Sequence, residues 1–126
     1  MLSIAIDLCK GIIENLRKEN ELRLDERIRI SGILDEIGSI LIDTSEKLKK
    51  DEYPSFNCMM LEKLANQLHF QLIDLVNVND LDNLHKVLVE SSNVEKSFAQ
   101  RKDPQTILII ENAAAEFKTL SLMLKI

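Results

Sequence analysis

The last stretch of the chain, from Asp103 to Ile126, constrains the fold most, because its apolar residues recur at helical spacing in two adjacent rows. The rows are Ile107, Ile110, Ala114, Phe117 and Leu124, and beside them Ile109, Ala113, Leu120 and Met123. Asp103 followed by Pro104 is typical of a helix start, since Asp accepts hydrogen bonds from free backbone N–H groups and Pro fits the first helical position. A helix that is apolar over more than half of its circumference must be covered on several sides. We therefore expect this helix at the centre of a bundle.

The rest of the chain also carries helical periodicity. It predicts helices over about residues 2–20, 24–50 and 56–76, and a fourth that begins near residue 80. The run 91–93, Ser-Ser-Asn, either breaks this fourth helix or lies within one helix that continues to about residue 101. The sequence therefore predicts a single all-α domain over residues 1–126, an up-and-down bundle of four to five helices with the C-terminal helix central.

Two details of this pattern make further predictions. In the third helix, a leucine seam through Leu61 and Leu68 is expected to be buried, with Met59, Met60, Phe70 and Ile73 broadening it. In the second helix, Gly32 and Gly38 each weaken the helix by roughly 1 kcal/mol relative to Ala. These glycines indicate either that another backbone approaches closely or that they are simply tolerated.

Composition and charge exclude several classes of function. A net charge of -5 and an aromatic content of 4% argue against nucleic-acid binding, which relies on excess basic residues and on aromatic stacking. Glu111, Glu116 and Lys118 lie in the middle of the most apolar helix, which argues against a stable membrane span. The N-terminus lacks the basic start of a signal peptide. Cys9 and Cys58 lie in apolar helical patterns, so we expect reduced core thiols in a cytoplasmic protein.

Catalytic and metal-binding motifs are weak. His69 and His85, with the two cysteines, are the only soft metal ligands, and their spacing is not that of a zinc site. Asp82-x-x-His85 is a single acid-x-x-His match, whereas a di-metal bundle site needs two. We therefore expect no metal, no cofactor and no enzymatic activity. A phosphotransfer role for His69 or His85 remains an alternative, and burial of both rings would exclude it.

Two features are candidates for protein interaction. Arg23, Arg27 and Arg29 lie close together, and a cluster of guanidinium groups can dock an acidic partner. Acidic residues are interleaved with them, so the alternative is a neutralised, solvated face. Tyr53 precedes Pro54 in a rigid corner between two helices, where it serves either to pack the corner or to contact a partner.

The spacing of residues 27–58 resembles a segment that recurs in cyanobacterial proteins. The shared positions are Arg27, Ile30, Leu34, Ile37, Gly38, Leu41, Leu48, Tyr53, Pro54 and Cys58. The resemblance implies a small helical protein of uncharacterised function, or part of a larger protein associated with signalling and conflict modules, and it carries over no catalytic residue. The family pattern has Gly where this chain has Asp51 and Phe56, so we expect the turn to be made differently here.

These observations favour a non-enzymatic protein-interaction or adaptor module. Its partner is expected to be another protein or a second copy of the chain in a homodimer, and not a nucleic acid. One alternative is a membrane-associating helical effector, in which the C-terminal or N-terminal helix becomes exposed on activation. The other is a helical phosphotransfer or metal-binding protein.

Overall fold

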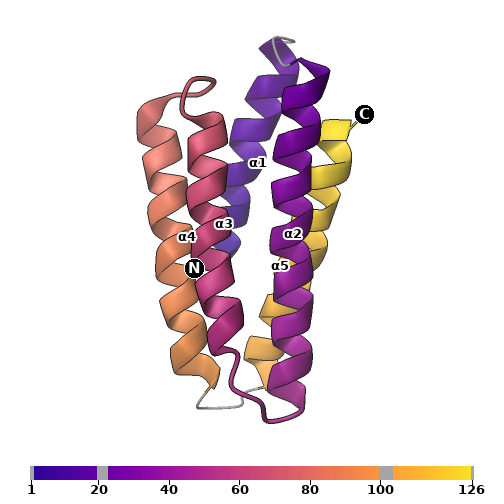
Figure 1. The fold of residues 1–126 in the computed structure, drawn as a ribbon, viewed down its shortest axis with the longest axis vertical. Helices are drawn as coiled ribbons and strands as arrows, with labels where there is room; N and C mark the ends of the chain where they lie inside the picture. The colour runs from indigo at the N-terminus through magenta and orange to yellow at the C-terminus, as the bar shows by residue number, and fades with distance from the viewer. Residues whose placement is uncertain (1, 20–22, 100–103, 126) are drawn as a thin grey trace.

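The computed structural model describes residues 2–19, 23–99 and 104–125, with the side chains of residues 18, 19 and 91–99 left undescribed. All secondary structure in these residues is helical, and the chain runs alternately up and down the bundle (Figure 1). The helices are α1 (Leu2–Glu19), α2 (Leu24–Lys49), α3 (Ser55–Leu72), α4 (Val78–Ala99) and α5 (Pro104–Lys125). The all-α, up-and-down bundle of four to five helices expected from the sequence is thus confirmed, with five helices in the described residues. The expected helix cap at Asp103 lies outside the described residues.

The helices form a ring in which α5 lies between α1 and α2, and α3 and α4 complete the circle. Because the number of helices is odd, one neighbouring pair must run parallel, and this pair is α1 and α5. The contact between α5 and α2 is the most extensive in the bundle. Helix α5 is nevertheless a member of the ring with two main neighbours, so Leu108, Ile109 and Leu122 on its outer side are exposed.

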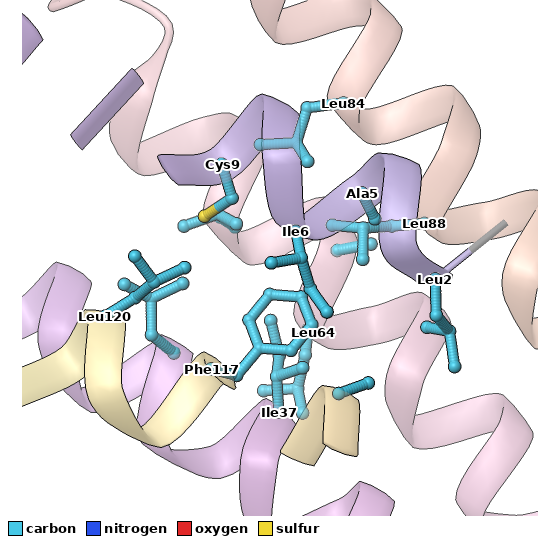
Figure 2. Packing of buried hydrophobic residues seen from close by; sticks show 14 of the residues in the cluster. Leu2, Ala5, Ile6, Cys9, Ile37, Leu64, Leu84, Leu88, Phe117 and Leu120 are labelled. Atoms are coloured by element: carbon cyan, nitrogen blue, oxygen red, sulfur yellow. The ribbon is translucent and has the colours of Figure 1, made fainter. Parts of the chain in front are cut away.

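The interior of the ring is filled by aliphatic side chains from every helix. Phe117 of α5 is completely buried, and Figure 2 shows its ring among side chains that include Ile6, Ile37 and Leu64. The predicted leucine seam of α3 is confirmed, since Leu61 and Leu68 are buried in the same cluster. Interior packing of this extent accounts for most of the stability of such a bundle, because isolated helices are marginal in water.

Helix α4 is a single helix from Val78 to Ala99, which decides between the two alternatives for the run 91–93. The corner between α2 and α3 closes through a left-handed residue and two backbone hydrogen bonds. Asp51 adopts a φ of 62°, the left-handed conformation that glycine favours. The backbone N–H of Glu52 donates to the carbonyl of Lys47, and that of Asp51 to the carbonyl of Leu48, which together form a Schellman cap. Asp51 therefore adopts the left-handed conformation that Gly usually supplies at the end of a helix.

The two glycines of α2 differ in their surroundings. A Cβ atom at Gly38 would lie 2.9 Å from Cγ of Lys118 and 3.1 Å from the carbonyl oxygen of Ala114, both in α5. A Cβ at Gly32 would meet nothing within 4 Å. The close approach of another backbone is therefore confirmed for Gly38, whereas Gly32 is tolerated.

Across the described ranges, none of the helices combines the length and the apolar character needed to cross a lipid bilayer.

Candidate protein-interaction surface

The arginine cluster at the start of α2 is engaged by neighbouring groups. Nε of Arg23 lies 3.1 Å from Oε1 of Glu26, and a guanidinium nitrogen of Arg29 lies 3.8 Å from a carboxylate oxygen of Asp25. Nε of Arg27 donates to the carbonyl of Leu124 at 3.0 Å. That carbonyl belongs to the last turn of α5, whose carbonyl groups lack helical partners. Arg27 thus joins α2 to α5, and docking of an acidic partner on Arg23 and Arg29 stays a prediction.

The corner before α3 exposes a group of large apolar side chains. Tyr53 is 54% exposed, and Phe56 and Met59, in the first turns of α3, are 58% and 46% exposed. Pro54, by contrast, is buried and fixes the direction in which the chain enters the helix. Tyr53 thus precedes, by three and six residues, two exposed apolar residues that the sequence did not single out as candidates for binding.

The opposite end of α3 exposes Phe70, at 74%, and Ile73, at 43%. Both line a cavity of about 330 Å³ between α3 and the start of α2, which Glu26 and Arg29 also line. Oε2 of Glu26 is buried and has no hydrogen-bond partner among the described residues. This end of α3 thus combines exposed apolar side chains with charged groups along one cavity.

The prediction that Met59, Phe70 and Ile73 broaden the buried seam of α3 is wrong. The buried residues of this helix face α2, α4 and the interior, whereas these three lie on its outer side. A signal for this was present in the sequence. Phe56 and Phe70 are fourteen residues apart, which is two heptads, and so are Met59 and Ile73, whereas the inward leucines occupy other heptad positions. In the structure these two sets of residues lie on opposite sides of the helix.

A polar cluster joins α2 to the start of α3. Asn57 is 1% exposed, and its side-chain amide donates to a carboxylate oxygen of Asp43 at 2.9 Å and to Oγ1 of Thr44 at 3.0 Å. Its oxygen accepts a hydrogen bond from Nζ of Lys47 at 2.8 Å. No side chain caps the start of α3. Asn57 instead fixes the position of α3 against α2.

This cluster makes the stability of the fold depend on pH. The hydrogen bond from Asn57, and then that from Lys47, holds the pKa of Asp43 below its ordinary value. A carboxyl group with a lowered folded-state pKa stabilises the fold above its unfolded pKa of about 4 and loses this contribution as the pH falls through the folded value. We expect Asp43→Asn to be less stable than the wild type at pH 7, and the gap to close as the pH falls through the lowered folded-state pKa of Asp43.

Urea unfolding of the wild type, Asp43→Asn, Asn57→Ala and the double variant from pH 2 to pH 7 measures this effect. Asn57→Ala removes the main cause of the shift, so Asp43→Asn should have little effect in that background. A gap that is the same at both ends of the pH range would contradict the assignment.

The two histidines, sixteen residues apart in the sequence, contact each other between α3 and α4. Their rings meet edge to face, with centroids 5.0 Å apart. Nε2 of His69 lies 3.0 Å from a carboxylate oxygen of Asp82, and Nε2 of His85 lies 2.6 Å from the amide oxygen of Asn66. Both rings are partly exposed, so the burial that would exclude a phosphotransfer role is not observed.

Metal ligands do not converge in the described part of the chain, where no group of three or more His, Cys, Asp or Glu is placed to hold an ion. Asp82 pairs with His69 of α3 rather than with His85 of its own motif. Cys9 and Cys58 are buried and form no disulfide, as predicted. Burial raises the pKa of the Cys9 thiol to about 12, so this thiol is a poor nucleophile in the folded protein.

Comparison with known proteins found no matching family model, no matching curated protein and no matching solved structure. The resemblance of residues 27–58 to cyanobacterial helical proteins therefore stays a prediction.

Proposed function

We propose that the protein is a non-enzymatic protein-interaction module that binds its partner through α3 and the corner preceding it. The observation that carries this proposal is the placement of the aromatic residues. Of the four aromatic side chains that the structure describes, only Phe117 is in the core, whereas Tyr53, Phe56 and Phe70 are each more than half exposed. All three lie on α3 or directly before it.

The physical argument is that exposed aromatic residues are costly unless they are covered. A Phe side chain gains about 1.5–3 kcal/mol when it is removed from water, so exposing two on one helix forgoes a large stabilisation of the folded chain. A partner that covers them recovers this free energy on binding. Aromatic residues and methionine are accordingly enriched in protein interfaces, and aromatic side chains dominate binding hot spots.

Site-specific photo-crosslinking tests the proposal directly. We expect a photoreactive phenylalanine analogue in place of Tyr53 to form covalent adducts with a polypeptide in the cells that produce the protein. The matched control carries the same analogue in place of Leu122, which is 60% exposed on the outer side of α5. Adducts at position 53 and not at position 122 support binding through α3. The absence of adducts at position 53, or equal adducts at both positions, would refute it.

Vesicle sedimentation combined with alkylation of Cys9 distinguishes the proposed function from the membrane-associating alternative. That alternative needs α1 or α5 to leave the ring, which would uncover buried residues such as Cys9 and Phe117. Under the proposed function, the protein stays in the supernatant when anionic vesicles are sedimented, and Cys9 stays protected from alkylation in their presence. Co-sedimentation together with rapid alkylation of Cys9 would favour the membrane effector instead.

A further inference from the structure

The exposed residues on the outer side of α3 follow a heptad pattern. Six exposed residues occupy alternating spacings of three and four along this side. They are Phe56, Met59, Lys63, Asn66, Phe70 and Ile73. We refer to these residues as the outer seam. Spacings of three and four that repeat every seven residues are those of the a and d positions of a coiled coil, which pack against a facing helix. Ile73, at the end of the helix, keeps helical backbone angles, so the seam is continuous.

The outer seam is self-complementary when it is reversed. Its midpoint lies between Leu64 and Ala65, and reversal about this point exchanges Phe56 with Ile73 and Met59 with Phe70. In an antiparallel pair of helices, a positions face d positions of the partner. Two copies of α3 related by a two-fold axis at the midpoint would therefore bury four apolar pairs, two on each side of a polar centre.

The polar centre of the outer seam also fits this arrangement. Reversal exchanges Lys63 with Asn66, so each ammonium group faces an amide and not another ammonium group. The amide oxygen of Asn66 accepts a hydrogen bond from His85 and has a second lone pair for a donor from the other copy. A parallel pair would instead place Lys63 against Lys63 of the second copy, which is unfavourable.

The residues on either side of the outer seam bring no like charges together across the two-fold axis. Glu62 comes to lie near His69 of the second copy, and Met60 near Gln67. An isologous interface requires one patch to be complementary to itself, and most such interfaces belong to two-fold homodimers. We infer that the outer seam of α3 binds the outer seam of a second copy of the chain, antiparallel, in a two-fold dimer. This inference rests on the proposed function, because it names the occupant of the proposed surface.

Light scattering or sedimentation equilibrium over a concentration series gives the first test. The expected mass is twice that of the 14.4 kDa chain. Phe70→Glu should raise the dissociation constant at least ~30-fold, as for a hot-spot residue, with unchanged helix content. The matched control, Leu122→Glu, changes an exposed residue on α5 and should leave the dimer intact. A monomer at every concentration, or a dimer that Phe70→Glu leaves unchanged, overturns the inference.

Disulfide trapping tests the antiparallel register. Phe56→Cys and Ile73→Cys lie at opposite ends of the outer seam, about 25 Å apart along the helix axis at 1.5 Å per residue. We expect a disulfide-linked dimer only when the two variants are mixed and oxidised, with differently tagged chains to identify the mixed product. Linkage of each variant with itself would show a parallel pair and overturn the two-fold arrangement.

These experiments distinguish failure of the dimer from failure of the proposed function. A monomeric chain that still gives photo-adducts of a different polypeptide at position 53 refutes the dimer and leaves the interaction module standing. A dimer that survives Phe70→Glu, together with no adducts at position 53, removes both.

Discussion

Phe117→Ala should lower the free energy of unfolding by about 3–5 kcal/mol, the cost typical of truncating a fully buried aromatic side chain. The side chain of Phe117 is 0% exposed and lies in the core cluster with residues from all the other helices. Its removal leaves a cavity bounded by several helices, which cannot all move inward together. For a domain of this size, the loss corresponds to a fall of roughly 10–20 °C in Tm. Urea unfolding and thermal melting followed by circular dichroism measure both quantities.

Phe70→Ala is the matched control, since it removes the same atoms from a side chain that is 74% exposed. Its effect on the isolated chain should stay within about 0.5 kcal/mol, as for most surface substitutions. The comparison is made at concentrations low enough to avoid self-association, which would add its own stabilisation. A loss for Phe70→Ala comparable to that for Phe117→Ala would mean that Phe70 is buried, and would remove the outer seam on which the proposed interaction depends.

The bundle was predictable because helical periodicity records which side of each helix is buried. The inner leucines of α3 and the apolar rows of α5 were recognised in this way, and most of these residues are buried. Periodicity does not record how many neighbours a helix has. The wide apolar surface of α5 therefore suggested a central helix, whereas a ring of five leaves Leu108, Ile109 and Leu122 at the surface.

The candidate interaction surface was predictable only in part, for a related reason. Tyr53 was recognised from its position before Pro54. Phe70 and Ile73 were assigned to the core because they are apolar. An apolar residue looks the same in a sequence whether it packs inside its own chain or against another protein. What distinguishes core residues from exposed residues on α3 is the side of the helix on which they lie. That side becomes clear once the positions of α2 and α4 are known. The contact between His69 and His85 depends on the register of α3 against α4, which local patterns do not determine.

The tightest contact in the bundle leads to the second large prediction. At Gly38 an added Cβ would lie 2.9 Å from Cγ of Lys118 and 3.1 Å from the carbonyl oxygen of Ala114. The Lys118 chain is not free to move, because Nζ binds a carboxylate oxygen of Asp35 at 3.0 Å and Oγ of Ser39 at 2.7 Å. Moving the Ala114 carbonyl would require a shift of α5. We expect Gly38→Val to lower the free energy of unfolding by about 3 kcal/mol, at the upper end of the usual cost of overpacking.

Gly32→Val is the control, because it makes the same change in the same helix at a site with nothing within 4 Å of the added Cβ. Val has a slightly better helix propensity than Gly, so Gly32→Val should change stability by about 0.5 kcal/mol or less. Urea unfolding of both variants measures the difference. Adding Lys118→Ala to Gly38→Val should recover only part of the loss, since the Ala114 carbonyl still blocks the new side chain. Equal effects at the two glycines would show that α2 and α5 are not packed this closely.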